Sequence, residues 1–137
     1  MSIVLLHEND FSKVYFNKEL NIGGIEWKDN KLTSDEYRLA FNKVIEYTNG
    51  RNIFTNFYSD TRCQSVVTPG DRKWFEEVVI PQAIKNGLKR GAVVISGNVF
   101  KKYYMNMIIN ASRRFPITIK IFDDIDKART WLQSFDD

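Results

Sequence analysis

The stretch Asn52-Ile-Phe-Thr-Asn-Phe-Tyr-Ser-Asp-Thr-Arg-Cys-Gln-Ser-Val-Val-Thr-Pro-Gly-Asp-Arg-Lys-Trp74 contains a strand, a polar loop and the start of a helix. Its first part, Asn52 to Ser59, is rich in aromatic and β-branched residues and predicts a buried strand. Thr68 is a good helix cap, and Pro69 stands at the favoured first helical position. In layered α/β proteins, ligands and partners meet the sheet at the carboxyl ends of its strands. The loop between this strand and this helix is therefore the first candidate site.

Three short β-rich runs precede this stretch, and polar pieces separate them. They are Ile3 to His7, Lys13 to Phe16 and Asn21 to Lys28. Connections this short join antiparallel neighbours, so we expect a three-stranded meander. Gly23-Gly24 in the third run predicts a bulge or a close approach of another chain segment.

A capping box then predicts a helix that begins after Thr33. In such a box the Thr33 hydroxyl accepts from the Glu36 amide, and the Glu36 side chain returns to the Thr33 amide. Asn49-Gly50 marks the end of this helix. A second helix starts at Pro69 and ends at Asn86-Gly87, with a bend near Pro81, which lacks a backbone donor.

The rest of the chain alternates between strand and helix. Ala92 to Ser96 and Ile117 to Phe122 predict strands. The helix between them is capped by Ser96 or Asn98, has Phe100 on its apolar face and stops before Pro116. Asp123 or Asp124 caps a last helix with the apolar residues Ala128, Trp131, Leu132 and Phe135.

The element order is thus βββαβαβαβα. It predicts an α/β fold with a mixed sheet, antiparallel in its N-terminal meander and parallel later, and with helices packed on the sheet. No repeat, linker or low-complexity segment divides the sequence. A chain of 137 residues is long enough for a hydrophobic core, so we expect one domain over residues 1–137.

Composition narrows the function classes. One cysteine and one histidine leave no disulfide and no cluster of soft metal ligands, so we expect no metal and no cofactor, in a reducing cytoplasmic setting. No basic and apolar leader opens the chain, and no run of about twenty apolar residues predicts a membrane span. The net charge is only +3. The basic pairs Lys101-Lys102 and Arg113-Arg114 indicate a solvated helix surface and not a nucleic-acid interface.

Several local patterns resemble the STAS-like superfamily of small bacterial proteins, which includes the anti-sigma factor antagonists and overlaps in description with the Sec14 lipid-carrier fold. The patterns that carry the resemblance are Ile25-Glu26-Trp27-Lys28, Thr68-Pro69-Gly70-Asp71-Arg72-Lys73-Trp74, Ile80-Pro81-Gln82-Ala83, Gly87-Leu88-Lys89-Arg90, Ala92-Val93-Val94-Ile95, Phe122-Asp123-Asp124-Ile125-Asp126-Lys127-Ala128 and Trp131-Leu132. They are packing and capping patterns. The resemblance implies a STAS-like fold and, in the antagonists, a phosphorylated serine at the start of the helix after the central strand. Thr68 stands near that position, although the sequence around it is Val67-Thr68-Pro69-Gly70.

Four polar residues of the loop are therefore the candidate partner or ligand residues: Asp60, Arg62, Thr68 and Asp71. Thr68 is the candidate phosphoacceptor, because a helix N-terminus favours added negative charge. An ordinary cap and solvated loop charges are the simpler interpretations. An enzyme that uses Asp60, Arg62 and Cys63 is the least favoured hypothesis, since the single histidine, His7, lies far away in sequence.

The aromatic and methionine side chains admit two interpretations. At helical and strand spacing they predict core, but they also suit the wall of a cavity for a small apolar or lipid ligand. These side chains are Trp27, Tyr37, Phe41, Trp74, Phe75, Tyr103, Tyr104 and Met107. The leading hypothesis is a non-catalytic regulatory or protein-interaction module of STAS-like type, with a protein partner or a homodimer. The alternative is a carrier or sensor of a small apolar molecule.

Overall fold

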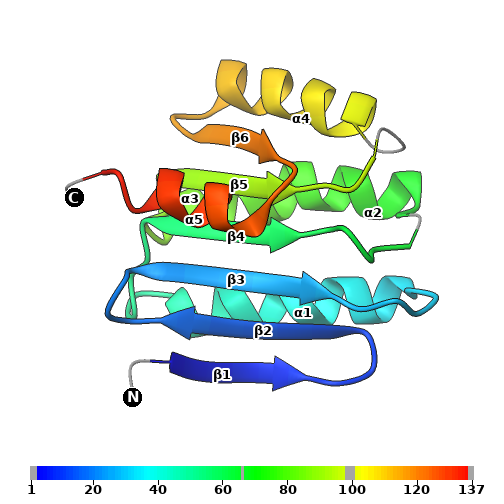
Figure 1. The fold of residues 1–137 in the computed structure, drawn as a ribbon, viewed down its shortest axis with the longest axis horizontal. Helices are drawn as coiled ribbons and strands as arrows, with labels where there is room; N and C mark the ends of the chain where they lie inside the picture. The colour runs from blue at the N-terminus through cyan, green and yellow to red at the C-terminus, as the bar shows by residue number, and fades with distance from the viewer. Residues whose placement is uncertain (1–2, 66, 98–100, 136–137) are drawn as a thin grey trace.

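The computed structural model describes residues 3–65, 67–97 and 101–135 and contains a six-stranded sheet whose strands lie in chain order (Figure 1). The strands are β1 (Ile3–Glu8), β2 (Ser12–Asn17), β3 (Ile22–Trp27), β4 (Asn56–Asp60), β5 (Arg90–Val94) and β6 (Thr118–Phe122). Pairing is antiparallel from β1 to β3 and parallel from β3 to β6. The predicted mixed sheet, with its N-terminal meander, is confirmed.

The helices follow the predicted order. They are α1 (Ser34–Thr48), α2 (Pro69–Trp74), the π-helical turn η1 (Phe75–Val79), α3 (Ile80–Lys85), α4 (Lys101–Arg114) and α5 (Ile125–Leu132). Strand order advances in one direction from β3 to β6, and right-handed crossovers then place the connecting helices on one face of the sheet. In Figure 1, α5 lies in front of the sheet, whereas α1, α2 and α3 lie behind it.

Alternation along the strands builds a core on each face. Val93 points to the face where Ile80 of α3 and Met107 of α4 are buried. The next residue, Val94, points to the opposite face and packs near Leu132 of α5. Successive strand residues face opposite sides, so β5 is covered on both faces and carries an apolar run without alternation.

The capping box before α1 is only half formed. Thr33 Oγ1 accepts from the Glu36 amide at 3.2 Å, as predicted. The Glu36 carboxylate does not return to the Thr33 amide, because it accepts from Asn9 Nδ2 at 2.9 Å instead. The helix still begins where the sequence predicts, and Glu36 links it to the turn between β1 and β2.

The prediction that the central strand begins at Asn52 is wrong, since β4 begins at Asn56. Asn52 adopts a positive φ of 50°, which is incompatible with an extended strand. The side chain of Ile53 is 64% exposed. The chain therefore turns at Asn52 and enters the sheet four residues later.

The paired glycines of β3 mark a close approach and not a bulge. A Cβ at Gly24 would lie 2.6 Å from Cζ of Tyr58, and one at Gly23 would overlap the ring of Phe16. The irregular register lies in β1 instead, between Leu5 and His7. Because these two glycines have no side chain, the rings of Phe16 on β2 and Tyr58 on β4 can approach the β3 backbone closely.

Pro81 explains the change of helix type after Trp74. Proline donates no backbone hydrogen bond and its ring crowds the preceding turn. The Ile80 amide bonds to the carbonyl of Phe75, five residues back, so the helix widens into η1, which ends two residues before Pro81. The predicted bend takes the form of this π-helical turn, and the segment ends as expected at Asn86, followed by Gly87 with φ of 115°.

Smaller differences concern element ends. β5 begins at Arg90 and not at Ala92, and the Arg90 Nε atom donates to Asn56 Oδ1 of β4 at 2.8 Å. α5 is capped by Asp124 and ends at Leu132, so Phe135 lies beyond it. The expected cap residue Asn98 and the apolar residue Phe100 lie outside the described residues. Among the described helices, none is both long and apolar enough to cross a membrane.

Candidate functional site

The loop after β4 begins with an ion pair between Asp60 and Arg62. Arg62 Nε and Nη2 lie 2.9 and 2.8 Å from the two carboxylate oxygens, and the Arg62 amide also donates to Asp60, at 3.2 Å. Asp60 is buried, whereas the Arg62 side chain is 43% exposed. Hydrogen bonds and then the charge of Asp60 raise the pKa of Arg62. Each group neutralises the other, which leaves little unpaired charge for a ligand.

Thr68 and Asp71 lie at the start of α2, and Asp71 joins this helix to α1. Thr68 Oγ1 accepts from the Asp71 amide at 3.3 Å. The Asp71 carboxylate accepts from the Ser34 hydroxyl at 2.6 Å and from Arg38 Nε at 3.0 Å. Burial by itself raises the pKa of Asp71, but the hydrogen bonds from Ser34 and Arg38 outweigh burial and hold this pKa below its usual value. The ionised carboxylate is thus used to hold two helices together.

The four predicted loop residues come together only in these two pairs. No hydrogen bond or ion pair between described residues connects Asp60 or Arg62 with Thr68 or Asp71. The Thr68 side chain caps α2 and is exposed. As placed, these residues serve the local structure of the loop and of the helix that follows it.

Cys63 of the same loop is exposed and reduced. The usual partner of a catalytic cysteine is a histidine within hydrogen-bond reach. His7 lies on β1, which is separated from β4 by β2 and β3. Within the described ranges, no three His, Cys, Asp or Glu side chains come together as a metal site.

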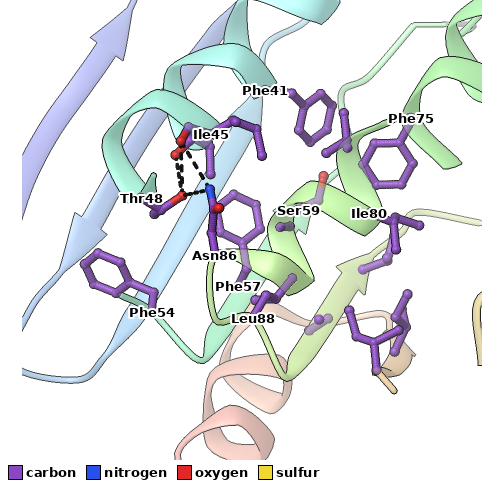
Figure 2. A pocket seen from close by; sticks show the side chains of 18 of the residues that line it. Phe41, Ile45, Thr48, Phe54, Phe57, Ser59, Phe75, Ile80, Asn86 and Leu88 are labelled. Carbon is purple, nitrogen blue, oxygen red and sulfur yellow. Dashed lines mark hydrogen bonds between the residues drawn. The ribbon is translucent and has the colours of Figure 1, made fainter. Parts of the chain in front are cut away.

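An apolar cavity of about 90 Å³ lies between the sheet and helices α1 and α3 (Figure 2). Its floor contains Phe57, Gly91 and Ile119, which are paired neighbours on β4, β5 and β6. The residues above this floor are Phe41, Val44 and Ile45 of α1, Phe75 of η1, and Ile80 and Ala83 of α3. Except for a few polar groups, the wall is hydrocarbon.

Small side chains explain why space remains here. A Cβ at Gly91 would lie 3.7 Å from Ile119 Cγ1 and 4.0 Å from the Phe57 carbonyl oxygen, which are ordinary contact distances. The fold therefore has room for a methyl group that the sequence does not supply. An empty cavity of this size costs about 2 kcal/mol of stability at roughly 24 cal/mol per Å³.

The polar groups at one end of the cavity bond to one another. Asn86 Nδ2 donates to Thr48 Oγ1 at 3.0 Å and to the Ile45 carbonyl at 3.3 Å (Figure 2). Thr48 in turn donates to the Val44 carbonyl at 2.9 Å, and Gln82 Nε2 donates to Asn86 Oδ1 at 3.0 Å. These bonds tie the last residue of α1 to the end of α3 and hold the helices apart at a fixed distance above the sheet.

The aromatic side chains divide between the two interpretations of the sequence. Phe41, Phe75 and Met107 line the cavity. Trp27 and Tyr37 instead stack on each other in the core, with ring centroids 5.4 Å apart. The spacing of residues along a helix or strand does not distinguish a core residue from a residue that lines the cavity, because both lie on the buried face of the element. The glycine at position 91, inside the strand Arg90–Val94, was the single local signal.

A second apolar hollow, open to solvent, runs between α4 and β6. We call it the α4–β6 groove; its residues are Ile95, Gly97, Met105, Ile108, Ile109, Ile119, Lys120, Ile121, Phe122 and Asp123. Its volume is about 780 Å³. Met105 and Ile109 are 48% and 45% exposed, and β6 is a terminal strand of the sheet. The groove thus combines exposed apolar surface with a strand that has an unpaired edge.

The basic residues at the end of α4 lie in a third hollow of mixed charge. Arg113 and Arg114 line it together with Glu76 and Glu77 of η1. Burial raises the pKa of Glu76, and the nearby Arg114 charge lowers it, with a net rise. Arg72 and Lys73 of α2 also line this hollow, so four basic and two acidic side chains meet there.

The comparisons with known proteins do not assign the chain to a family. No protein-family model matches the chain, and no match was found among curated proteins or solved structures. The resemblance to STAS-like proteins therefore stays a prediction from the sequence.

Proposed function

We propose that this chain acts by binding and not by catalysis, as a regulatory or protein-interaction module of STAS-like type, and that its partner surface is the α4–β6 groove. The observation that carries the proposal is the exposed apolar wall of this groove beside the free edge of β6. Large exposed apolar patches on small proteins mark interaction sites. An open strand edge adds backbone groups that a second strand can pair with.

The partner that we propose is a second copy of the chain. Two β6 strands paired antiparallel about Ile121 place Ile121 opposite its counterpart and Lys120 opposite Phe122 of the other copy. No like charges meet in this register. Within one chain, Lys120 Nζ lies 5.6 Å from the centre of the Phe122 ring. A lysine and a phenylalanine at these positions of two copies can therefore make the same favourable contact.

Two other candidate functions have less support. A drug-sized or lipid ligand needs roughly 300 to 1,000 Å³, and the cavity between the sheet and α1 and α3 offers about 90 Å³. An enzyme built on the loop after β4 would use Asp60, Arg62 and Cys63. The two charged residues pair with each other, and the single histidine, His7, lies on β1, separated from β4 by β2 and β3.

Light scattering after size-exclusion chromatography, over a wide concentration range, tests the proposal. We expect a dimer for the wild type and a monomer for Ile109→Lys, which places a charge in the groove. Ile3→Lys is the matched control, since Ile3 is 52% exposed but lies on β1 at the other edge of the sheet. A wild type that is monomeric throughout, or a dimer disrupted by Ile3→Lys and not by Ile109→Lys, contradicts the proposed surface.

A further inference from the structure

We propose that the cavity above Gly91 is a binding site for a small uncharged molecule of hydrocarbon character. The site does not depend on self-association through the α4–β6 groove. Its ligand class follows from three properties of the cavity: its volume, the chemistry of its wall and the rigidity of its frame.

Volume sets the upper limit on the ligand. An apolar protein cavity of about 150 Å³ stays dry and binds benzene or xenon. The present cavity, about 90 Å³, is smaller. It therefore suits a molecule below the size of benzene, on the order of four heavy atoms.

The chemistry of the cavity wall disfavours a charged ligand. Phe57, Val93 and Ile119 present hydrocarbon from the sheet, and α1 and α3 add aliphatic and aromatic groups from above. An ion moved into such surroundings loses its hydration without a compensating partner. Thr48 and Asn86 offer none, because their groups are engaged with each other and with the Val44, Ile45 and Gln82 groups. Ser59, a third polar residue of the wall, accepts from Trp27 Nε1 at 3.1 Å, and one uncharged hydroxyl does not balance a buried charge.

The frame keeps the space from closing. The Asn86 side chain fixes the end of α3 to the end of α1, as Figure 2 shows. Gly91 and Ala83, on the sheet and the helix side, are too short to fill the gap. A preformed apolar space binds without the cost of opening it, which favours a ligand over collapse.

Xenon is the direct probe, and isoleucine methyl groups are the reporters. In the full chain labelled at isoleucine methyls, a titration with dissolved xenon should shift the Ile45 and Ile117 signals until they saturate. Both residues line the cavity and lie outside the α4–β6 groove. Signals of Ile109 and Ile121 report on the groove, and that of the exposed Ile53 reports on non-specific effects.

The substitution Gly91→Ala should weaken xenon binding in the cavity. Its methyl group enters the cavity, so the saturable shift of Ile45 and Ile117 should weaken at least about tenfold. Gly70→Ala is the control, because a Cβ at that position meets no atom within 4 Å; it should bind xenon like the wild type.

The proposal is overturned if the wild-type Ile45 and Ile117 signals change only linearly with xenon, as Ile53 does, or if only the groove signals saturate. It is also overturned if a folded Gly91→Ala protein binds xenon as well as Gly70→Ala does. The wild-type titration decides the question even where the variant does not fold. The xenon titration and the test of self-association use different reporters. The cavity proposal can therefore fail while the dimer proposal holds, and the dimer proposal can fail while the cavity proposal holds.

Discussion

The loop after β4 and the cavity under α1 and α3 differ in what their own side chains satisfy. The loop collects Asp60, Arg62, Thr68 and Asp71 at the carboxyl end of a central strand, yet each of these groups has a partner inside the protein. The cavity carries no motif and looks like core, yet it contains space that no side chain fills. Polar residues at the carboxyl end of a strand are therefore weaker evidence for a binding site than unpaired polar groups or unfilled volume.

The largest expected effect comes from a charge placed in each region. Val93→Asp puts a carboxylate at a cavity residue that is 6% exposed, and it should destabilise the fold by at least about 4 kcal/mol. Cys63→Asp puts the same group in the exposed loop and should stay within about 0.5 kcal/mol of the wild type. Urea unfolding measures both. A Val93→Asp protein with a near-normal midpoint would mean that water fills the cavity.

A smaller effect is expected at the buried carboxylate of the loop. Asp71→Asn removes an ionised acceptor of two hydrogen bonds and should cost about 2 kcal/mol at neutral pH. The pKa of Asp71 is lowered in the folded state, so the stabilisation is present above the ordinary value of 3.8 and is lost as the pH falls through the lower, folded value. Unfolding free energies of the two proteins should thus converge in acid. Asp29→Asn, at an exposed position, should show no such convergence.

The cap of α2 offers an intermediate test of the loop. Thr68→Ala should cost about 1 kcal/mol, because the Asp71 amide loses its acceptor, while Thr68→Ser should restore most of it. Thermal unfolding of the three proteins measures the series. If alanine and serine variants are equally stable, the Thr68 hydroxyl does not contribute to stability as a cap.

The smallest expected change is a gain in stability in the cavity. Gly91→Ala should be more stable than the wild type, and its gain should exceed that of Gly70→Ala by about 0.8 kcal/mol, the value of one buried methyl group. Both substitutions remove the same backbone freedom, so the difference isolates the filling of space. Equal gains for the two variants would indicate that the new methyl group meets strain at Gly91 instead of open space.

Much of the architecture could be predicted because its signals are local. Thr33 and Asp124 cap helices, Thr68 and Pro69 start α2, and Gly87 follows the end of α3 through a left-handed conformation. Each signal depends on backbone hydrogen bonds within a few residues. The start of β4 was misplaced, since Asn52 belongs to the turn after α1: it has a positive φ and its side chain donates to the Tyr47 carbonyl at 3.0 Å.

Polar residues were located correctly along the chain, but their roles were set by distant partners. Asp71 bonds to Ser34 and Arg38, more than thirty residues away, and Glu36 bonds to Asn9 instead of completing its capping box. Such partners are chosen by the way the helices meet over the sheet. The sequence shows which residues can accept a hydrogen bond, and the packing decides from whom they accept it.

By itself, the sequence determined the order of elements, the mixed sheet and the apolar faces, because hydrophobic periodicity and backbone chemistry act over short distances. Only the tertiary structure decided which apolar faces were filled. Whether Gly91 leaves room depends on how far α1 and α3 stand above β5, and the bonds between Asn86 and Thr48 help to set that distance. Packing volume is a property of three segments brought together, so none of them carries it alone.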